Sequence, residues 1–141
     1  MAISFFFESI NAQLKNIRKR KAWIKQVVNQ EGHVVKTLNY IFCDDEYLLE
    51  INKQHLQHHF YTDIITFDLS EKEEDIEGDI YVSLDRVKEN AVKHSESFND
   101  ELDRVLIHGV LHLLGFGDKD DLSTKEMRMK ENECLSLRLE M

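Results

Sequence analysis

Residues 105–118 read VLIHGVLHLLGFGD and carry the most informative pattern in the chain. Apolar side chains fill almost every position up to Leu114, which is typical of a buried helix. His108 and His112 interrupt this apolar run four positions apart, so their imidazoles share one helix face about one turn apart. The stretch therefore predicts a buried helix that presents two neighbouring imidazoles on one side.

Gly115 and Asp118 extend the pattern beyond the end of this helix. Glycine tolerates the left-handed conformation that ends many helices, so we expect the chain to turn back at Gly115, with Gly117 as a second flexible position. Asp118 then returns toward the two imidazoles. Zinc accepts histidine and carboxylate ligands, and three protein ligands leave one tetrahedral position open. We expect one zinc ion, or another divalent transition metal, to be held for catalysis by His108, His112 and Asp118.

Position 109 distinguishes this pattern from that of zinc proteases with the same ligand spacing. Those enzymes carry a glutamate general base directly after the first histidine, whereas Gly109 has no side chain. The pattern therefore indicates a metallohydrolase with another base and disfavours peptide hydrolysis. A simpler alternative is that His108 and His112 are core histidines with ordinary hydrogen-bond partners.

The sequence on both sides of this helix predicts a mixed fold. Strand-like stretches are residues 3–8, 34–43, 64–69 and 79–83. Periodicity predicts a helix over 11–30, and capping residues predict the others. Asp44-Asp45 cap a helix that runs to 56, and Ser83 caps one over 84–95. Asn99 or Asp100 caps a helix that runs to 114, and Ser123 with Glu126 begins the last helix. Because strands and helices do not alternate strictly, we expect an α+β or α/β fold with about four strands in a mixed sheet and about five helices. No linker or repeat divides residues 1–141, so a single domain is expected.

Composition and charge narrow the class of protein. The chain is 42% hydrophobic and 32% charged, which is typical of a folded globular protein. It has no apolar run long enough for a membrane span and no secretion-signal pattern, so we expect a cytoplasmic protein. Cys43 and Cys134 are expected to be reduced, partly buried thiols. The net charge of −9 argues against a general nucleic-acid coat but allows RNA binding along one local track.

Several motifs make the sequence similar to the YbeY family of bacterial endoribonucleases. The densest is HGVLHLLG at 108–115, supported by TDIITF at 62–67, GDI at 78–80, EL at 101–102 and RV at 104–105. The resemblance covers nearly the whole chain. It implies a zinc-dependent endoribonuclease that cuts single-stranded RNA in 3′-end maturation of small-subunit ribosomal RNA and in ribosome quality control. It also implies the small ribosomal subunit as partner, with no membrane and no DNA involved.

Two positions depart from the family pattern. The family usually has histidine as its third ligand, where this chain has Asp118. Carboxylate is a competent zinc ligand, so we expect the site to persist with altered affinity and a less positive metal centre. The family also usually carries an RNA-contacting arginine where this chain has Leu56. Arg104, His58 and His59 are therefore the candidates for binding the substrate in its place.

Other side chains are further candidates for RNA contacts. The first predicted helix carries basic residues that form either a phosphate-binding patch or an ordinary solvated face: Lys15, Arg18, Lys19, Arg20, Lys21 and Lys25. Phe60 and Tyr61 are expected either to stack on unpaired bases or to join the core. Asp63 and Asp79 are expected either to orient a ligand histidine or a water or to stabilise turns.

Two alternative functions remain open beside the endoribonuclease. One is a non-catalytic ribosome-assembly factor with a structural metal, which the acidic charge and Leu56 favour. The other is a metallohydrolase on another substrate, including peptides, which the shared ligand spacing favours. Loss of RNA cleavage on chelation would favour the endoribonuclease over both.

Overall fold

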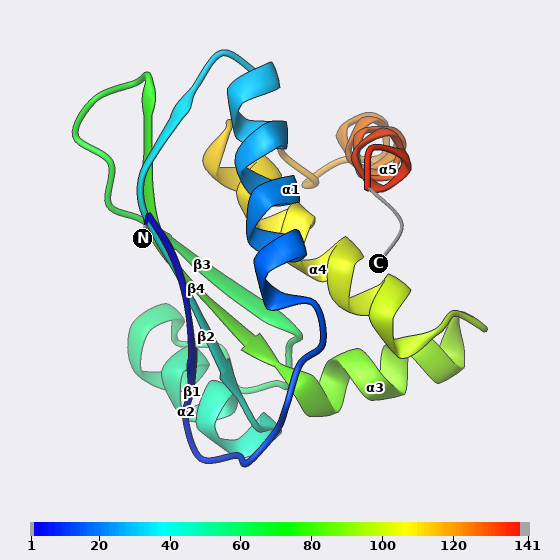
Figure 1. Cartoon of the computed structure of the whole chain (residues 1–141). Coiled ribbons are helices and arrows are strands. Elements are labelled where there is room, and N and C mark those ends of the chain that lie inside the picture. Colours follow the sequence, from blue (N-terminus) through cyan, green and yellow to red (C-terminus); the bar gives the residue numbers. More distant parts are fainter. Residues whose placement is uncertain (1, 139–141) are drawn as a thin grey trace.

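The computed structural model of the protein describes residues 2–138 and builds them around one mixed β-sheet (Figure 1). The strands are β1 (Ile3–Phe7), β2 (Val34–Cys43), β3 (Ile64–Asp68) and β4 (Asp75–Ser83). The helices are α1 (Ile17–Gln30), α2 (Asp45–Leu56), α3 (Leu84–Lys93), α4 (Phe98–Leu113) and α5 (Asp121–Ser136). This content confirms the predicted α+β class with a mixed sheet of four strands and five helices.

The sheet combines parallel and antiparallel pairing. Its strand order is β1-β2-β4-β3, with β1 parallel to β2, β2 parallel to β4, and β3 antiparallel to β4. Parallel neighbours need a crossover connection, and α1 supplies it between β1 and β2. Strand β3 therefore forms one edge of the sheet, next to β4, and α4 packs against both of these strands.

Helices cover both faces of the sheet because successive strand residues point to opposite sides. Ile80 and Val82 of β4 belong to the main hydrophobic cluster, which also contains buried residues of α1, α4 and α5. Ile65 of β3 instead packs with Leu48 of α2 in a second, smaller cluster. In Figure 1, α1, α4 and α5 accordingly lie on one side of the sheet and α2 lies on the other.

Helix α4 approaches the sheet closely at Gly109. A Cβ atom added there would lie 2.9 Å from Ile80 Cδ1 and 3.0 Å from Ile64 Cδ1, so only glycine allows this approach without displacing the isoleucines. With position 109 against the sheet, His108 and His112 lie at the edge of the contact between helix and sheet and are partly exposed. The packing of α4 therefore sets which face of the helix is available for chemistry.

The predicted starts of α1 and α5 are wrong. Helix α1 begins at Ile17 and not at residue 11, because Asn16 adopts a left-handed conformation (φ 57°) that cannot continue a helix. Helix α5 begins at Asp121, with Asp120 as N-cap and Ser123 as the third helical residue. Ser123 still takes part in a capping box, but as the partner that bonds back to the Asp120 backbone.

Two further boundaries differ from the prediction. Ser97 caps α4 by accepting a hydrogen bond from the backbone N–H of Asp100, a role expected for Asn99 or Asp100 themselves. Strand β4 begins at Asp75 and not at residue 79, since its first residues pair with β2 from Val34 onward. Helix α4 and strand β4 are therefore both longer than the local sequence pattern predicted.

Two findings concern the environment of the chain. Within residues 2–138 no helix has the length and apolar character needed to cross a membrane. Cys43 and Cys134 are free thiols, and both are more deeply buried than expected, at 0% and 2% exposed.

Candidate metal centre and adjoining pocket

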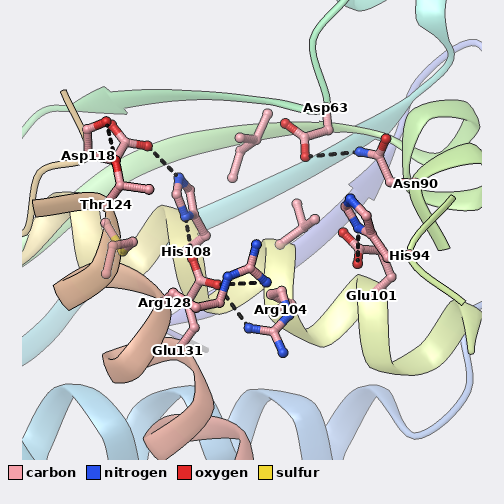
Figure 2. Close-up of a pocket in the computed structure, with 13 residues that line it drawn as sticks. Asp63, Asn90, His94, Glu101, Arg104, His108, Asp118, Thr124, Arg128 and Glu131 are labelled. Carbon is pink, nitrogen blue, oxygen red and sulfur yellow. Dashed lines mark hydrogen bonds and ion pairs between the residues drawn. The ribbon is translucent and has the colours of Figure 1, made fainter. Parts of the chain in front are cut away.

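A pocket of about 300 Å³ lies between α3, α4, α5 and the chain that enters β3 (Figure 2). His108 and Asp118 line one end of it, and Asn90 and His94 line the other. The side chains come from segments far apart in the sequence, so the pocket exists only in the folded chain. Two of the three predicted metal ligands, His108 and Asp118, therefore line the pocket, and His112 lies beside it.

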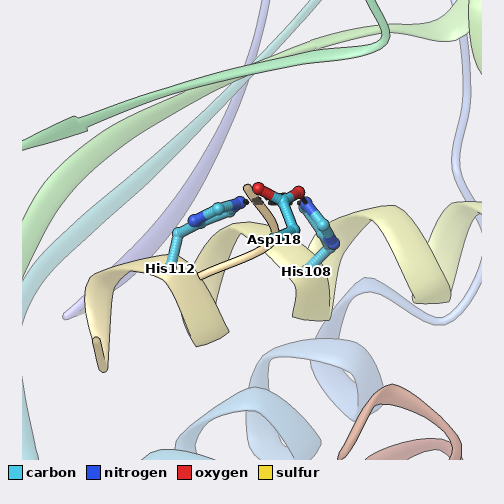
Figure 3. Close-up of side chains that lie close together, drawn as sticks. All are labelled: His108, His112 and Asp118. Atoms are coloured by element: carbon cyan, nitrogen blue, oxygen red, sulfur yellow. Dashed lines mark hydrogen bonds and ion pairs between the residues drawn. The ribbon is translucent and has the colours of Figure 1, made fainter. Parts of the chain in front are cut away.

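The three predicted ligand side chains converge on one point above α4 (Figure 3). The two imidazole Nε2 atoms of His108 and His112 are 3.0 Å apart, and Asp118 Oδ2 lies 3.4 Å and 3.5 Å from them. Ligand atoms bound tetrahedrally at about 2.0–2.1 Å lie about 3.3 Å from one another. The predicted convergence is confirmed, and these spacings fit one zinc-sized ion.

The return of the chain to the helix depends on Gly115. Gly115 has φ 102°, and the C-terminus of α4 closes with hydrogen bonds from Phe116 N–H to Leu111 C=O (2.9 Å) and from Gly115 N–H to His112 C=O (3.0 Å). This is a Schellman motif, in which a left-handed residue ends the helix and reverses the chain. Gly117 is not among the residues of positive φ, so the second flexible position is not used in that way.

The cluster is open to solvent on one side. The side chains of His112 and Asp118 are 33% and 38% exposed, and within residues 2–138 the cluster has three potential ligands. Closed structural zinc sites usually have four protein ligands, whereas catalytic sites keep one position for water or substrate. The arrangement therefore suits an ion that takes part in a reaction.

Glu131 of α5 supports the cluster from behind, and the sequence pattern did not identify it. Its side chain is 5% exposed, and its Oε2 accepts a hydrogen bond from Nδ1 of His108 at 2.6 Å. A neutral His108 that donates from Nδ1 keeps the lone pair on Nε2, which faces the cluster. Met127, Glu131 and Cys134 form the buried stripe of α5, and the one charged member of this stripe was the available signal.

Charge and burial act in opposite directions on the two histidines. Burial alone lowers the pKa of His108, but the hydrogen bond and negative charge of Glu131, with other carboxylates nearby, raise that pKa above its usual value. Burial and the neighbouring His108 lower the pKa of His112. Burial opposes ionisation of Glu131, yet hydrogen bonds from His108 and Arg104 lower its pKa. A metal ion held there would therefore compete with a proton mainly at His108.

The structure gives a physical reason for the missing glutamate at position 109. The Cβ of any side chain there would meet Ile80 and Ile64, so it would enter the sheet contact and not the metal cluster. A general base next to the first histidine is thus excluded by packing as well as by residue type. This supports the argument against a protease of the usual kind.

The candidate substrate-binding residues separate into two groups. Arg104 lines the pocket, and its Nη1 donates to Glu131 Oε1 at 3.0 Å. His58 and His59 are exposed in the segment after α2 and are not among the pocket-lining residues. The ring of His58 stacks on Phe60, with centroids 5.1 Å apart. The structure thus brings Arg104, but not these two histidines, to the candidate centre.

The predictions for Phe60 and Tyr61 and for the basic residues of the first helix are also corrected by the structure. Phe60 and Tyr61 are 58% and 46% exposed, so the alternative that placed them in the core is wrong. Arg20 is 1% exposed and pairs with Asp103 at 2.8 Å, so it does not belong to a basic surface patch. Its guanidinium is not available to bind an RNA phosphate, because it pairs with the buried carboxylate of Asp103.

The two aspartates expected beside the site have different positions. Asp63 lines the pocket and accepts a hydrogen bond from Asn90 Nδ2 at 3.4 Å. Asp79 lies on β4 and accepts a hydrogen bond from Asn39 Nδ2 at 3.1 Å, without lining the pocket. Of the two, only Asp63 is placed to meet a ligand there.

Fold and site together define a class: an α+β protein with a solvent-open His-His-Asp cluster beside a polar pocket. Comparison with known sequences identifies the family within this class. The family described as Endoribonuclease YbeY matches residues 7–138. The chain therefore belongs to the YbeY family.

Individual relatives agree with this family assignment. The Endoribonuclease YbeY of Cytophaga hutchinsonii is 48% identical over 136 residues, which cover 96% of this chain and 95% of the relative. That of Flavobacterium psychrophilum is 47% identical, with 96% and 95% covered. A solution structure of a Thermotoga maritima protein superposes with a TM-score of 0.67 at 30% identity, covering 94% of this chain and 87% of the other.

Proposed function

We propose that this protein is a zinc-dependent endoribonuclease that cuts single-stranded RNA, with the ion held by His108, His112 and Asp118. The observation that carries the proposal is the spacing of the three ligand atoms, 3.0–3.5 Å, beside a polar pocket. The relatives named as endoribonucleases supply the substrate class. When bound, a zinc ion there supplies a hydroxide nucleophile at neutral pH and positive charge for the phosphate.

The surrounding side chains hold and orient the reacting groups. Glu131 accepts the Nδ1 proton of His108 and so keeps Nε2 directed at the cluster. Arg104 is paired with the same carboxylate and lines the pocket, where its remaining N–H donors can bind an RNA phosphate. His58 and His59 lie outside the pocket and would contact nucleotides further along the strand.

The cellular role that we propose is 3′-end maturation of small-subunit ribosomal RNA and ribosome quality control in the cytoplasm. Membership of the YbeY family supports this role. Such a role requires recognition of an unpaired segment on a large particle. An open site at the surface of a single domain, residues 1–141, suits that task better than an enclosed one.

Cleavage of a labelled single-stranded RNA tests the activity. We expect zinc-loaded protein to cut it, and to lose the activity after chelation and in His112→Ala. His33→Ala is a matched control, because His33 bonds to the backbone of Glu31, remote from the cluster. Undiminished cleavage by His112→Ala would remove the proposal.

A non-catalytic ribosome-assembly factor is the second candidate. Leu56 is 43% exposed at the end of α2, at the place of the usual RNA-contacting arginine. An apolar side chain there weakens phosphate binding. Tight binding to small ribosomal subunits by zinc-loaded protein that cuts no RNA would favour this candidate.

A further inference from the structure

The end of the pocket away from the metal ligands has the composition of a small-molecule subsite. Polar side chains of Asp63, Asn90, His94 and Glu101 gather there (Figure 2), and Ile64 and Val105 add apolar surface to the lining of the pocket. The whole pocket, including the end lined by His108 and Asp118, has a volume of about 300 Å³, at the lower end of the range for ligand pockets, roughly 300–1,000 Å³. The space suits one nucleotide and not a longer stretch of RNA.

Of the four acidic side chains that line the pocket, Asp118 belongs to the candidate metal cluster, and two of the other three have basic partners. Glu131 binds His108 and Arg104, and Glu101 lies 3.5 Å from His94. Asp63 instead is half-buried in the pocket wall, where its carboxylate accepts a hydrogen bond from Asn90 Nδ2 at 3.4 Å and backbone hydrogen bonds from its own N–H and that of Ile64. Burial raises the pKa of Asp63, although the nearby His108 and the two backbone N–H groups oppose the rise. Such a carboxylate gains from a ligand that donates hydrogen bonds.

The position of Asp63 relative to the metal cluster relates it to the substrate. In Figure 2, Asp63 lies across the pocket from Asp118, with His108 between the two ends. A phosphate at the cluster can therefore direct its attached base into the pocket. Unpaired RNA bases are commonly extruded in this way, held between apolar side chains and recognised by their Watson–Crick edge.

Resting on the function proposed above, we propose that this pocket takes one base next to the scissile phosphate, and that Asp63 selects guanine there. Guanine presents its N1–H and N2 amino donors side by side, which match the two oxygens of a carboxylate. Uracil presents one N–H between two carbonyl oxygens, and the carboxylate repels both of these. The amide of Asn90 lies within 3.4 Å of Asp63 and can donate to guanine O6.

Binding of nucleoside monophosphates to the zinc-loaded full chain tests the subsite. Both 5′-GMP and 5′-UMP carry the same phosphate, so contacts of the phosphate with the ion cancel in the ratio of their dissociation constants. We expect GMP to bind at least about tenfold more tightly than UMP, as measured by calorimetry. Equal affinities would mean that only the phosphate is held, and would overturn the proposal even where no variant can be made.

The variant Asp63→Asn tests the residue assigned to selection. It keeps the size of the side chain but replaces one acceptor oxygen by a donor, so we expect GMP affinity to fall to that of UMP. Asp68→Asn is the matched control, because Asp68 is exposed at the other end of β3. Its GMP preference should equal that of the wild type. A GMP preference that persists in Asp63→Asn would contradict the role of Asp63.

The outcome separates this inference from the proposed function. RNA cleavage with equal binding of GMP and UMP would overturn the subsite and leave the nuclease standing. A GMP preference without RNA cleavage would overturn the nuclease and leave the subsite standing.

Discussion

At the scale of single residues, Asp118 gives the candidate centre its particular character. A carboxylate in place of a neutral imidazole would add one negative charge to the ligand set and so make an ion held there less positive. Asp118 can reach the imidazoles because its backbone C=O also accepts a hydrogen bond from Thr124 Oγ1 at 3.0 Å, which fixes the loop. The ligand is thus held by the start of α5 as well as by the end of α4.

Replacing Glu131 tests the support behind His108. Glu131→Gln removes the charge that orients His108 and holds Arg104, so we expect zinc affinity to fall about 10–100-fold. Competition with a fluorescent chelator measures the affinity. Glu133→Gln is the control, since Glu133 is 65% exposed on the same helix. Equal zinc affinities for the two variants would show that Glu131 has no orienting role.

Acidification tests the electrostatics of the same pair. The pKa of His108 is raised, so its proton competes with zinc up to a pH above the ordinary value of about 6.5. As pH falls through that raised pKa, His108 becomes charged and zinc affinity should decline. Chelator competition between pH 5.5 and 8 follows the decline. An affinity that stays constant over this range would exclude His108 as a ligand.

At the scale of elements, the end of α4 shows how far the sequence determines the site. The spacing of His108, His112 and Gly115 predicted a helix that ends where the third ligand can return, and the Schellman motif confirms this. These features are local, so the pattern contains them. The role of Glu131 depends on how α5 packs against α4, 23 positions away from His108 in sequence, and no local pattern encodes that packing.

Glycine at position 78 is a second element-scale feature. A Cβ there would lie 2.5 Å from the backbone oxygen of Phe67, so β3 and β4 would have to separate. We expect Gly78→Ala to lower the free energy of unfolding by about 1–3 kcal/mol, measured by urea denaturation. Gly117→Ala is the control, because no heavy atom lies within 4 Å of its added Cβ. Equal stability of both variants would contradict the close pairing of the strands.

At the scale of the whole molecule, one buried ion network joins parts of the chain that are distant in sequence. Arg20 of α1 and Arg138, beyond α5, both bind Asp103 of α4, at 2.8 Å and 2.7 Å. Arg20 also donates to Asn99 Oδ1 at 2.8 Å and to the backbone oxygen of Lys15. The network fixes α1 and Arg138 against the helix that carries the candidate site.

This network also explains why Arg20 of α1 does not lie on the exposed basic face expected for this helix. A run of basic residues usually marks a solvated face. Arg20 is instead buried because it pairs with the buried carboxylate of Asp103, which lies 83 positions further along the chain and is not visible in the local pattern. The hydrogen bond to Lys15 and the left-handed Asn16 also set the start of the helix. Such long-range contacts are not visible in hydrophobic periodicity, whereas the four strands and five helices were.

Removing one partner of the network tests its contribution. Arg20→Met leaves Asp103 with Arg138 alone, so we expect a loss of about 3 kcal/mol in the free energy of unfolding. Urea denaturation measures it, with Arg18→Met on the exposed side of the same helix as control. We expect the control to stay within about 0.5 kcal/mol of the wild type. A similarly small change in Arg20→Met would mean that the network adds little to stability.

The metal content of the purified protein tests the central claim most directly. Elemental analysis of the wild type should find one zinc ion per chain, or one ion of a similar transition metal. The Asp118→Ala variant, which keeps both histidines but loses the third ligand, should contain far less at the same free-metal concentration. Equal metal content in the two proteins, or none in the wild type after incubation with zinc, would contradict a centre built from His108, His112 and Asp118.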